Sequence, residues 1–281
     1  MTEEIRRCFP PRSEDSHKGD YGTLLSVCGC YGMAGAALLA AEAALRCGTG
    51  LVVAAVPQTL YPIVAKALRE AVFAPYNEET AAETLLPRLK TASALLVGCG
   101  LGQEAWAAAL LKELLKNAEC PIVLDADGIN LAARHISIAE TVHAPLILTP
   151  HPKEMSRLLG GTVEEVQRDR EEAAREAVRR TGAVVVLKGH RTVIAAPDGE
   201  VWVNTTGNPG MAVGGSGDVL AGMIAAFVAQ GMSPMQAAKG GVYLHGMAGD
   251  RAAARLSQHA MLPSDIITEL SGLFLNLEQS E

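Results

Sequence analysis

Six short and almost wholly apolar runs recur through the first two thirds of this chain and restrict its fold more than any other feature. They lie at residues 23–28, 51–56, 95–97, 122–125, 146–149 and 183–188. Such runs are typical of strands that helices cover on both faces of a parallel sheet. Helical patterns at residues 34–47, 104–117 and 162–181 lie between them, and the last opens with a Thr162/Glu165 capping box. This alternation predicts an α/β fold.

After Lys188 the pattern changes. Residues 192–196 and 201–204 flank a Pro197-Asp198-Gly199 turn signal and predict a hairpin of two short strands. Three helices are expected after it, one opened by Asp218 and two at about 234–255 and 263–275. No repeat, low-complexity tract or linker is evident. We therefore expect residues 1–281 to form one three-layer domain, with a mostly parallel central sheet flanked by helices.

Composition and charge exclude several classes of protein. A chain of 281 residues buries about 75% of its unfolded surface, which is enough for one large domain. The net charge of −7 and the lack of a basic cluster argue against nucleic acid as a partner. The six cysteines form no CxxC pair, so we expect reduced thiols and a cytoplasmic location. We expect no membrane association, because no apolar signal core or membrane-length apolar stretch is present.

Residues 208–220, NPGMAVGGSGDVL, carry the strongest signal for chemistry. Apolar residues after Asp218 fall on one helical face, so a helix begins near this aspartate. The first N–H groups of a helix have no internal partner and carry the positive end of the helix dipole. Gly214, Gly215 and Gly217 place no side chain in front of them. The stretch therefore predicts a cradle for phosphate.

Asp218 has two interpretations. It can be an acidic residue in the first helical turn, which contributes a few tenths of a kcal/mol through the helix dipole. It can also be a general base that takes the proton of a hydroxyl attacking a phosphoryl group. The glycines favour the base, because a simple capping aspartate needs neither them nor the Asn208-Pro209-Gly210 turn before them.

Polar loops follow four of the predicted strands. In parallel sheets the ligand lies beyond the carboxyl ends of the strands, so these loops are expected to meet in one cleft. Each has a structural alternative: a tight glycine turn, a hydrogen-bonded histidine, a lysine that extends to solvent, or a helix-capping aspartate. The loops are residues 98–102 (GCGLG), Asp125 with Asp127 and Asn130, residues 149–154 (TPHPKE), and residues 188–192 (KGHRT).

These motifs resemble those of the ADP-dependent NAD(P)H-hydrate dehydratases, a family of the ribokinase-like superfamily. The resemblance runs from Ser16-His17-Lys18-Gly19 to residues 214–218, and its most specific part is TPHP with a following glutamate and then GGSGD. It implies a ribokinase-like fold with the hairpin near the nucleotide site. It also implies a lyase that dehydrates the S-epimer of hydrated NADH or NADPH with ADP, giving the restored cofactor, AMP and phosphate.

The resemblance also implies residue roles. Asp218 would be the catalytic base and would contact the substrate. The nucleotide would be bound by Lys188, Gly189, His190, Arg191, Thr192, Asn208, Gly215, Ser216 and Gly217. The hydrated dinucleotide would be bound by Ala36 or, preferably, Ala37, and by Gly102, His151 and Asp218. Asn130 and Glu154 would orient a hydrated Mg²⁺.

Family likeness further implies a homotetramer, and the small-residue helix at 34–47 is a candidate for contact with a neighbouring subunit. Val213 departs from the superfamily pattern, which often has a threonine there. His245 could approach the adenine, although a structural role is favoured. The main alternative function is an ATP-dependent kinase of a thiazole or pyrimidine alcohol. A catalytically silent nucleotide-binding protein is a second alternative.

Overall fold

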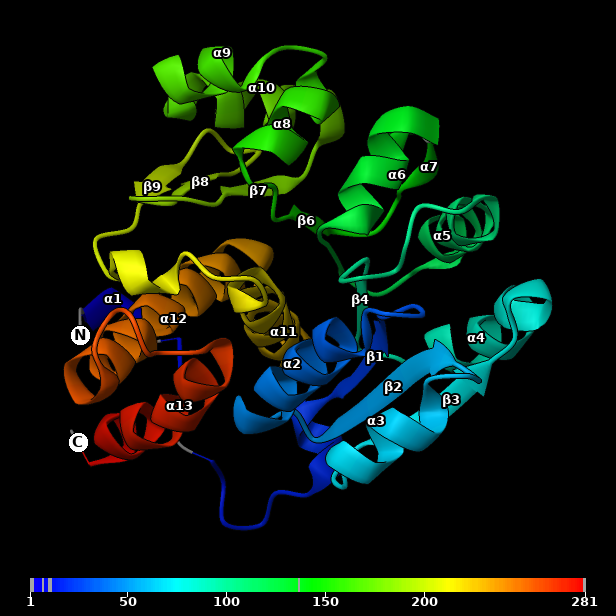
Figure 1. Cartoon of the computed structure of the whole chain (residues 1–281), viewed down its shortest axis with the longest axis horizontal. Coiled ribbons are helices and arrows are strands. Elements are labelled where there is room, and N and C mark those ends of the chain that lie inside the picture. Colours follow the sequence, from blue (N-terminus) through cyan, green and yellow to red (C-terminus); the bar gives the residue numbers. More distant parts are fainter. Residues whose placement is uncertain (1–2, 7, 10–11, 136, 280–281) are drawn as a thin grey trace.

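The computed structural model describes residues 3–6, 8–9, 12–135 and 137–279. Helices cover both faces of a nine-stranded sheet with the order β3-β2-β1-β4-β5-β6-β7-β8-β9 (Figure 1). Strands β1 to β7 are parallel, and β8 and β9 form an antiparallel hairpin at one edge. The strands are β1 Thr23–Val27, β2 Leu51–Pro57, β3 Val72–Tyr76, β4 Ala94–Val97, β5 Ile122–Leu124, β6 Leu146–Leu148, β7 Val184–Leu187, β8 Val193–Ala195 and β9 Val201–Val203. The expected three-layer architecture is confirmed.

The six strands and the hairpin predicted from the sequence form within one residue of their expected ends. Strand β3, with the sequence VFAPY, was missed. It holds Pro75, which argues against a central strand because proline lacks the N–H that a ladder needs. The strand lies at the sheet edge, beside β2 alone, where a missing N–H is tolerated.

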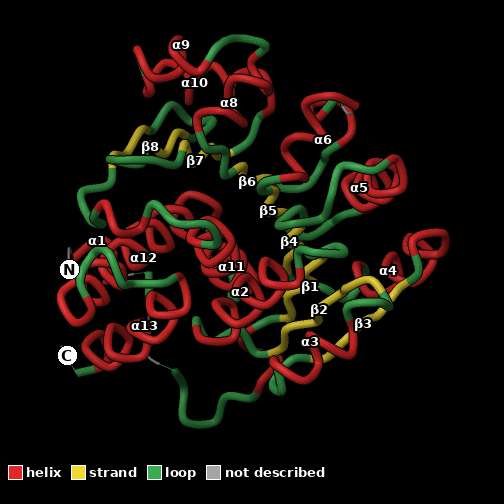
Figure 2. The backbone as a smooth tube through the Cα atoms, in the orientation of Figure 1, coloured by secondary structure: helices red, strands yellow, loops and turns green. Residues whose placement is uncertain are grey.

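The helices fill the two outer layers (Figure 2). They are α1 Glu3–Arg6, α2 Ala34–Arg46, α3 Tyr61–Ala67, α4 Ala81–Leu89, α5 Ala105–Asn117, α6 Asp127–His135, α7 Ile138–Thr141, α8 Pro152–Leu159, α9 Val163–Arg168, α10 Arg170–Thr181, α11 Ser216–Ala229, α12 Pro234–Leu256 and α13 Pro263–Glu278, with 3₁₀ turns η1 Lys18–Tyr21, η2 Glu78–Thr80 and η3 Pro209–Met211. None of the helices in the described part of the chain combines the length and apolarity needed to cross a bilayer.

One helix predicted as continuous is two separate helices in the structure. Residues 162–181 were expected as one helix, but α9 ends before Asp169 and α10 begins after it. Asp169 has an extended backbone, and its carboxylate accepts a hydrogen bond from the N–H of Glu172. The aspartate therefore caps a new helix instead of continuing the first one. The Thr162/Glu165 capping box at the start of α9 is confirmed.

Small residues let α2 pack closely against α11. A Cβ atom added to Gly222 of α11 would lie 2.1 Å from the carbonyl oxygen of Ala40 in α2. The buried residues of α2 are all alanines: Ala36, Ala37, Ala40, Ala41, Ala43 and Ala44. The fold buries these alanines against the chain's own core, so the contact with a neighbouring subunit that the sequence suggested for this helix could involve only its other residues and stays a prediction.

The topology places a crevice at the carboxyl ends of β1 and β4. The chain runs from β1 outward to β2 and β3 and then returns to β4 on the other side of β1. Loops that leave two adjacent strands in opposite directions separate at such a point, and ligands of open α/β sheets bind there. The contact of α2 with α11 brings the amino-terminal end of α11 to this edge (Figure 1).

We predict that Gly222→Ala lowers the free energy of unfolding by roughly 3 kcal/mol, because the new methyl group must push α2 away from α11. Gly35→Ala in α2 is the matched control, since a Cβ atom there has no neighbour within 4 Å. It should leave stability unchanged or raise it by up to about 1 kcal/mol. Urea denaturation measures both, and equal stabilities of the two variants would contradict the packing account.

Candidate active site

The glycine run ends at the first turn of α11. Gly215 is the N-cap residue and has a φ of 99°, in the region that favours glycine. A Cβ atom on Gly214 would meet nothing within 4 Å, and one on Gly217 would lie 3.3 Å from the Nζ atom of Lys188. The start of this helix is therefore open on the side of Gly214 and faces an ammonium group at Gly217. This geometry suits an anion.

Lys188 points inward, so it does not extend to solvent. Its side chain is 16% exposed, and its Nζ atom lies 2.6 Å from the Oδ1 atom of Asp125. The backbone N–H of Lys188 donates to the carbonyl of Pro150 in the loop after β6. Burial acts to lower the pKa of the ammonium, but the carboxylates of Asp125 and Glu154 outweigh it and raise the pKa. Lys188 is therefore a fixed positive charge beside the glycine cradle.

Asp125 connects the loops that follow four strands. It is 1% exposed. Its Oδ1 atom accepts hydrogen bonds of 2.6 Å from the hydroxyl of Thr149 and from Lys188, and its Oδ2 atom lies 3.5 Å from the thiol of Cys99. The sequence placed Asp125 at this edge but assigned it no role in the site. The sequence feature that could have indicated this role is the position of the aspartate directly after a buried strand.

Asp218 lies on the first turn of α11 without an ion pair to any described residue. Burial and the charge of Asp125 raise its pKa, Lys188 opposes this rise, and the resulting pKa is about 6. The ligand atoms of Cys99, Asp125 and Asp218 lie within 4.8 Å of one another. A carboxylate in these surroundings holds a proton more strongly than usual and is suited to general base catalysis near neutral pH.

His151 serves as the N-cap of α8. Its Nδ1 atom accepts hydrogen bonds from the N–H groups of Lys153 and Glu154, at 3.1 and 3.2 Å. The Glu154 carboxylate in turn accepts from the N–H of His151 at 2.8 Å. Burial and the charge of Lys188 lower the pKa of the imidazole. His151 is therefore a hydrogen-bonded structural residue at the start of α8. Its side chain is still 45% exposed at the edge formed by the carboxyl ends of the strands, which we call the carboxyl edge.

Asn130 and Glu154, the two predicted magnesium residues, are both buried near this edge. The Oδ1 atom of Asn130 accepts a 2.6 Å hydrogen bond from Arg157. The Oε2 atom of Glu154 lies 3.9 Å from the Lys188 ammonium, and burial raises the pKa of the Glu154 carboxyl. Both acceptors thus already face cationic side chains.

The loop after β4 needs its glycines. Gly98, Gly100 and Gly102 have φ values of 121°, 60° and 83°. A Cβ atom on Gly100 would lie 2.9 Å from the Cβ of Ala36, so this loop contacts the start of α2. The N–H of Gly102 donates to the carboxylate of Asp127, the first residue of α6, and this hydrogen bond fixes the loop. The structure thus brings Ala36, Gly102 and the carboxyl edge together.

A Cβ atom added to Gly29, in the loop after β1, would lie 3.0 Å from the Cβ of Ala37. The second alanine at the start of α2 therefore also lies against the loop after β1.

The loop between β7 and β8 carries the remaining predicted nucleotide residues. Gly189, His190 and Arg191 are exposed, whereas Thr192 is buried and its hydroxyl donates to the carbonyl of Gly189. These residues extend from Lys188 toward solvent at the edge that carries the cradle.

Asn208 caps the turn η3, and its amide group donates to Asp250 on α12. The N–H of Gly207 donates to the same carboxylate. Val213 is 37% exposed at the rim of the cradle. Asn208 therefore has a structural role in shaping the chain that leads to the glycine run.

His245 lies buried on α12, with its Nε2 atom 3.4 Å from the hydroxyl of Ser216. Burial lowers the pKa of this histidine to about 4, so the ring is neutral at physiological pH. It packs behind the first turn of α11, which agrees with the structural role favoured from the sequence.

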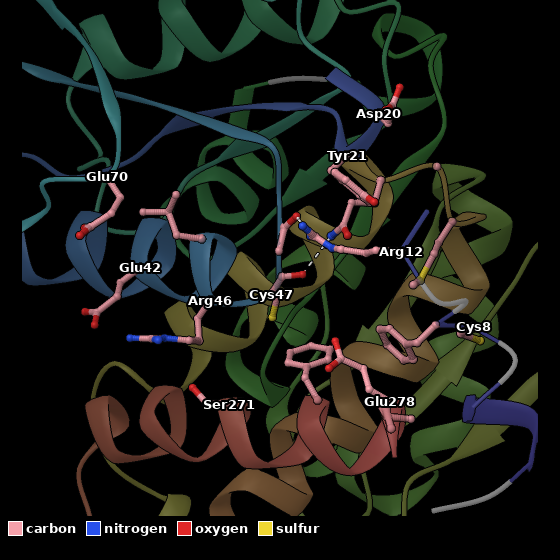
Figure 3. Close-up of a pocket in the computed structure, with 18 of the residues that line it drawn as sticks. Cys8, Arg12, Asp20, Tyr21, Glu42, Arg46, Cys47, Glu70, Ser271 and Glu278 are labelled. Atoms are coloured by element: carbon pink, nitrogen blue, oxygen red, sulfur yellow. Dashed lines mark hydrogen bonds between the residues drawn. The ribbon is translucent and has the colours of Figure 1, made fainter. Parts of the chain in front are cut away.

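A cavity of about 1240 Å³ lies at the other end of the sheet, before the strands begin (Figure 3). Arg12, Tyr21, Arg46 and Cys47 are among the residues that line it. None of the predicted site residues does so. The candidate active site is therefore the carboxyl edge, where the charged network and the glycine cradle meet.

We predict that Asp218→Asn stabilises the fold at alkaline pH. The folded protein raises the pKa of Asp218 from 3.8 to about 6, so it favours the protonated acid. The resulting stabilisation is complete below pH 3.8 and is lost as the pH rises through 6. Asparagine stays neutral, so the variant should be more stable by about 1–2 kcal/mol at pH 8 and equal near pH 4. Urea denaturation at both pH values measures this, and equal stability at pH 8 would contradict it.

Comparisons with known proteins identify the family of the chain. The sequence profile described as NAD(P)H-hydrate dehydratase matches residues 24–271. The chain is 46% identical over 281 residues to a bifunctional NAD(P)H-hydrate repair enzyme of Moorella thermoacetica, covering 98% of this chain and 53% of that protein. It spans about half the length of the bifunctional relatives that it matches. It is also 39% identical over 264 residues to the ADP-dependent (S)-NAD(P)H-hydrate dehydratase of Bacillus subtilis, covering 94% and 93% of the two chains.

Solved structures give the same result. The ADP/ATP-dependent NAD(P)H-hydrate dehydratase of Bacillus subtilis, co-crystallised with ATP and Mg²⁺, superposes with a TM-score of 0.90 at 37% identity, covering 98% and 97% of the chains. A hydroxyethylthiazole kinase of Pyrococcus horikoshii has a TM-score of 0.67 at 17% identity, over 99% and 95% of the chains, which shows a shared fold. The sequence profile and the curated relatives together show that the chain belongs to the NAD(P)H-hydrate dehydratase family.

Proposed function

We propose that the chain is a carbon–oxygen hydro-lyase that dehydrates the S-epimer of hydrated NADH and NADPH with ADP. Its products are the restored cofactor, AMP and phosphate. Relatives at 44% and 39% identity are named ADP-dependent (S)-NAD(P)H-hydrate dehydratase. The observation that carries the proposal is the position of Asp218, a carboxyl group with a pKa of about 6 on the first turn of a glycine-led helix.

In the proposed reaction Asp218 takes the proton from the hydroxyl of the hydrated nicotinamide ring. The hydroxyl oxygen attacks the β-phosphorus of ADP, and AMP leaves. The N–H groups at the start of α11 and the Lys188 ammonium stabilise the charge on the phosphoryl oxygens. The ring carbon–oxygen bond then breaks, phosphate departs with that oxygen, and the adjacent ring carbon loses a proton to restore the double bond.

The two ligands are assigned to neighbouring parts of the carboxyl edge. The nucleotide is bound by Lys188, Gly189, His190, Arg191, Thr192, Asn208, Gly215, Ser216 and Gly217. The hydrated dinucleotide is bound by Ala36, Ala37, Gly102, His151 and Asp218. The exposure of the loop after β7 and the contact of Ala36 with Gly100 support this division. It places Asp218 between the two ligands.

Asn130 and Glu154 fit a hydrated Mg²⁺ held through water. Their oxygens already accept hydrogen bonds, from Arg157 and from the N–H of His151, but each oxygen keeps a lone pair for a metal-bound water. The nearby cationic side chains of Arg157 and Lys188 disfavour direct coordination. When bound, the ion would neutralise phosphate charge and reduce its repulsion with Asp218.

The alternative is an ATP-dependent kinase of a thiazole or pyrimidine alcohol, which would use the same base and cradle. The likeness to the hydroxyethylthiazole kinase supports a common fold and nothing more specific. Identity to named dehydratases over more than 90% of the matched Bacillus subtilis protein favours the dehydratase.

We further propose that residues 1–281 form one domain that assembles as a homotetramer in the cytoplasm. The continuous nine-stranded sheet supports a single domain. The six cysteines are unpaired thiols, which supports a reducing compartment. The tetramer follows from the family resemblance, and its contacts must involve surfaces other than the alanine face of α2.

The function is tested by incubating the purified protein with hydrated NADH and either ADP or ATP. Absorbance of the dihydronicotinamide should return, with one AMP formed per cofactor when ADP is used. Absence of recovery with both nucleotides, together with phosphorylation of a thiazole alcohol, would support the kinase instead.

We predict that Asp218→Asn lowers turnover by at least about a hundredfold, because it removes the base. It should leave ADP affinity within a few-fold of the unmodified protein, since the helix N–H groups and Lys188 remain. Steady-state rates and calorimetric ADP binding measure the two effects. Loss of ADP binding together with turnover would argue against a role as base.

We predict that Gly217→Val prevents nucleotide binding. The new side chain would lie against the Lys188 ammonium, 3.3 Å from its Cβ atom, and would cover the first turn of α11. Gly272→Val on α13 is the matched control, because this glycine is outside the left-handed region and a Cβ atom there would meet only the end of the Arg251 side chain, at 3.1 Å. Calorimetry with ADP should show no binding to Gly217→Val. Retained affinity would mean that the phosphates lie elsewhere.

A further inference from the structure

Arg170 occupies an unusual position for a basic residue. It is the first residue of α10, where the helix dipole disfavours positive charge, and Glu171 and Glu172 follow it. In the part of the chain that the structure describes, its guanidinium nevertheless makes no ion pair with a carboxylate. Its Nε atom is buried without a hydrogen-bond partner. Partial burial lowers the pKa of this guanidinium by desolvation. Helix stability alone therefore does not account for Arg170.

The guanidinium bonds to the end of β7 instead. Its Nη2 atom donates to the carbonyl of Leu187 at 2.9 Å and to the carbonyl of Lys188 at 3.3 Å. Its Nη1 atom donates to the side chain of Gln167 at 3.0 Å. A Cβ atom on Gly189 would lie 3.0 Å from Nη1, so the glycine lets the guanidinium contact the backbone closely.

These contacts complete a set of three anchors on one residue. The N–H of Lys188 donates to Pro150, its carbonyl accepts from Arg170, and its ammonium pairs with Asp125. The first two anchors fix the peptide units on either side of the Lys188 Cα atom. The direction of the side chain is thereby set toward Gly217, where the ammonium lies beside the start of α11.

We propose that Arg170 is a positioning residue that holds the backbone of Lys188 and Gly189, so that the Lys188 ammonium faces the phosphates of the bound nucleotide. The inference rests on the proposed function, because it concerns the same nucleotide. Arg170 acts through Lys188 and does not itself contact the phosphates. Its loss should therefore weaken binding of the phosphates and not of the nucleoside.

The test is calorimetric binding of ADP with Mg²⁺, and of adenosine, to the full chain. Arg170→Gln should weaken ADP binding about tenfold, the loss expected when a charge-assisted hydrogen bond is removed, and should leave adenosine binding within twofold. Arg175→Gln is the matched control. Arg175 lies on the same helix and also donates to a backbone carbonyl, that of Gly199, and its loss should change neither affinity.

A double-mutant cycle separates action through Lys188 from a general effect on the fold. Lys188→Met alone should weaken ADP binding, and adding Arg170→Gln should weaken it by less than a further twofold. The proposal would be overturned if the losses of ADP affinity in the two single variants multiplied in the double variant. It would also be overturned if Arg170→Gln lost ADP and adenosine affinity equally. If Arg170→Gln loses cooperative thermal unfolding, Arg170→Lys replaces it and should bind ADP with intermediate affinity. Full ADP affinity in that variant would overturn the proposal.

Failure of the inference is distinguishable from failure of the proposed function. If the unmodified protein binds no ADP, the proposed function falls and the inference with it. If the unmodified protein and Arg170→Gln bind ADP equally, the inference alone is wrong.

Discussion

The buried pair of Asp125 and Lys188 holds the candidate site together. Removing either partner would leave the other charge buried and uncompensated, which costs about 3–5 kcal/mol in comparable proteins. The hydroxyl of Thr149 and the thiol of Cys99 also donate to the Asp125 carboxylate. It joins loops that follow separate strands of the sheet and presents the ammonium to Gly217. The geometry of the phosphate cradle therefore depends on the ion pair between Asp125 and Lys188.

The same pair sets the properties of Asp218. Burial and the negative charge of Asp125 raise its pKa, while Lys188 limits the rise to about 6. At that value the carboxylate is ionised at neutral pH and is also a stronger base than an exposed aspartate. The arrangement disfavours the folded state above pH 6, as expected where a site is organised for chemistry and not for stability. The close packing of α2 on α11 holds the helix that carries Asp218 against this network.

Much of the fold follows from local patterns in the sequence. Strands apolar on both faces and a glycine run ahead of a strongly apolar helix were predictable because the signals lie within each segment. Strand β3 was missed because the edge position that tolerates Pro75 is a property of the whole sheet. The break at Asp169 was missed because capping outweighed helical periodicity there. The roles of Asp125 and Arg170 depend on contacts with residues at least 17 positions away in sequence, which no local pattern records. The roles assigned to the nucleotide and substrate residues remain predictions.

The central claim is that the carboxylate of Asp218 and the cradle ahead of it act on the two sides of one phosphoryl transfer. Hydrated NADH carrying ¹⁸O in its ring hydroxyl, incubated with the protein and ADP, tests this most directly. The account predicts that the label appears in the released phosphate, because the ring oxygen is phosphorylated before the carbon–oxygen bond breaks. Unlabelled phosphate with ¹⁸O in water would show that ADP cleavage and dehydration are separate events and would contradict the account.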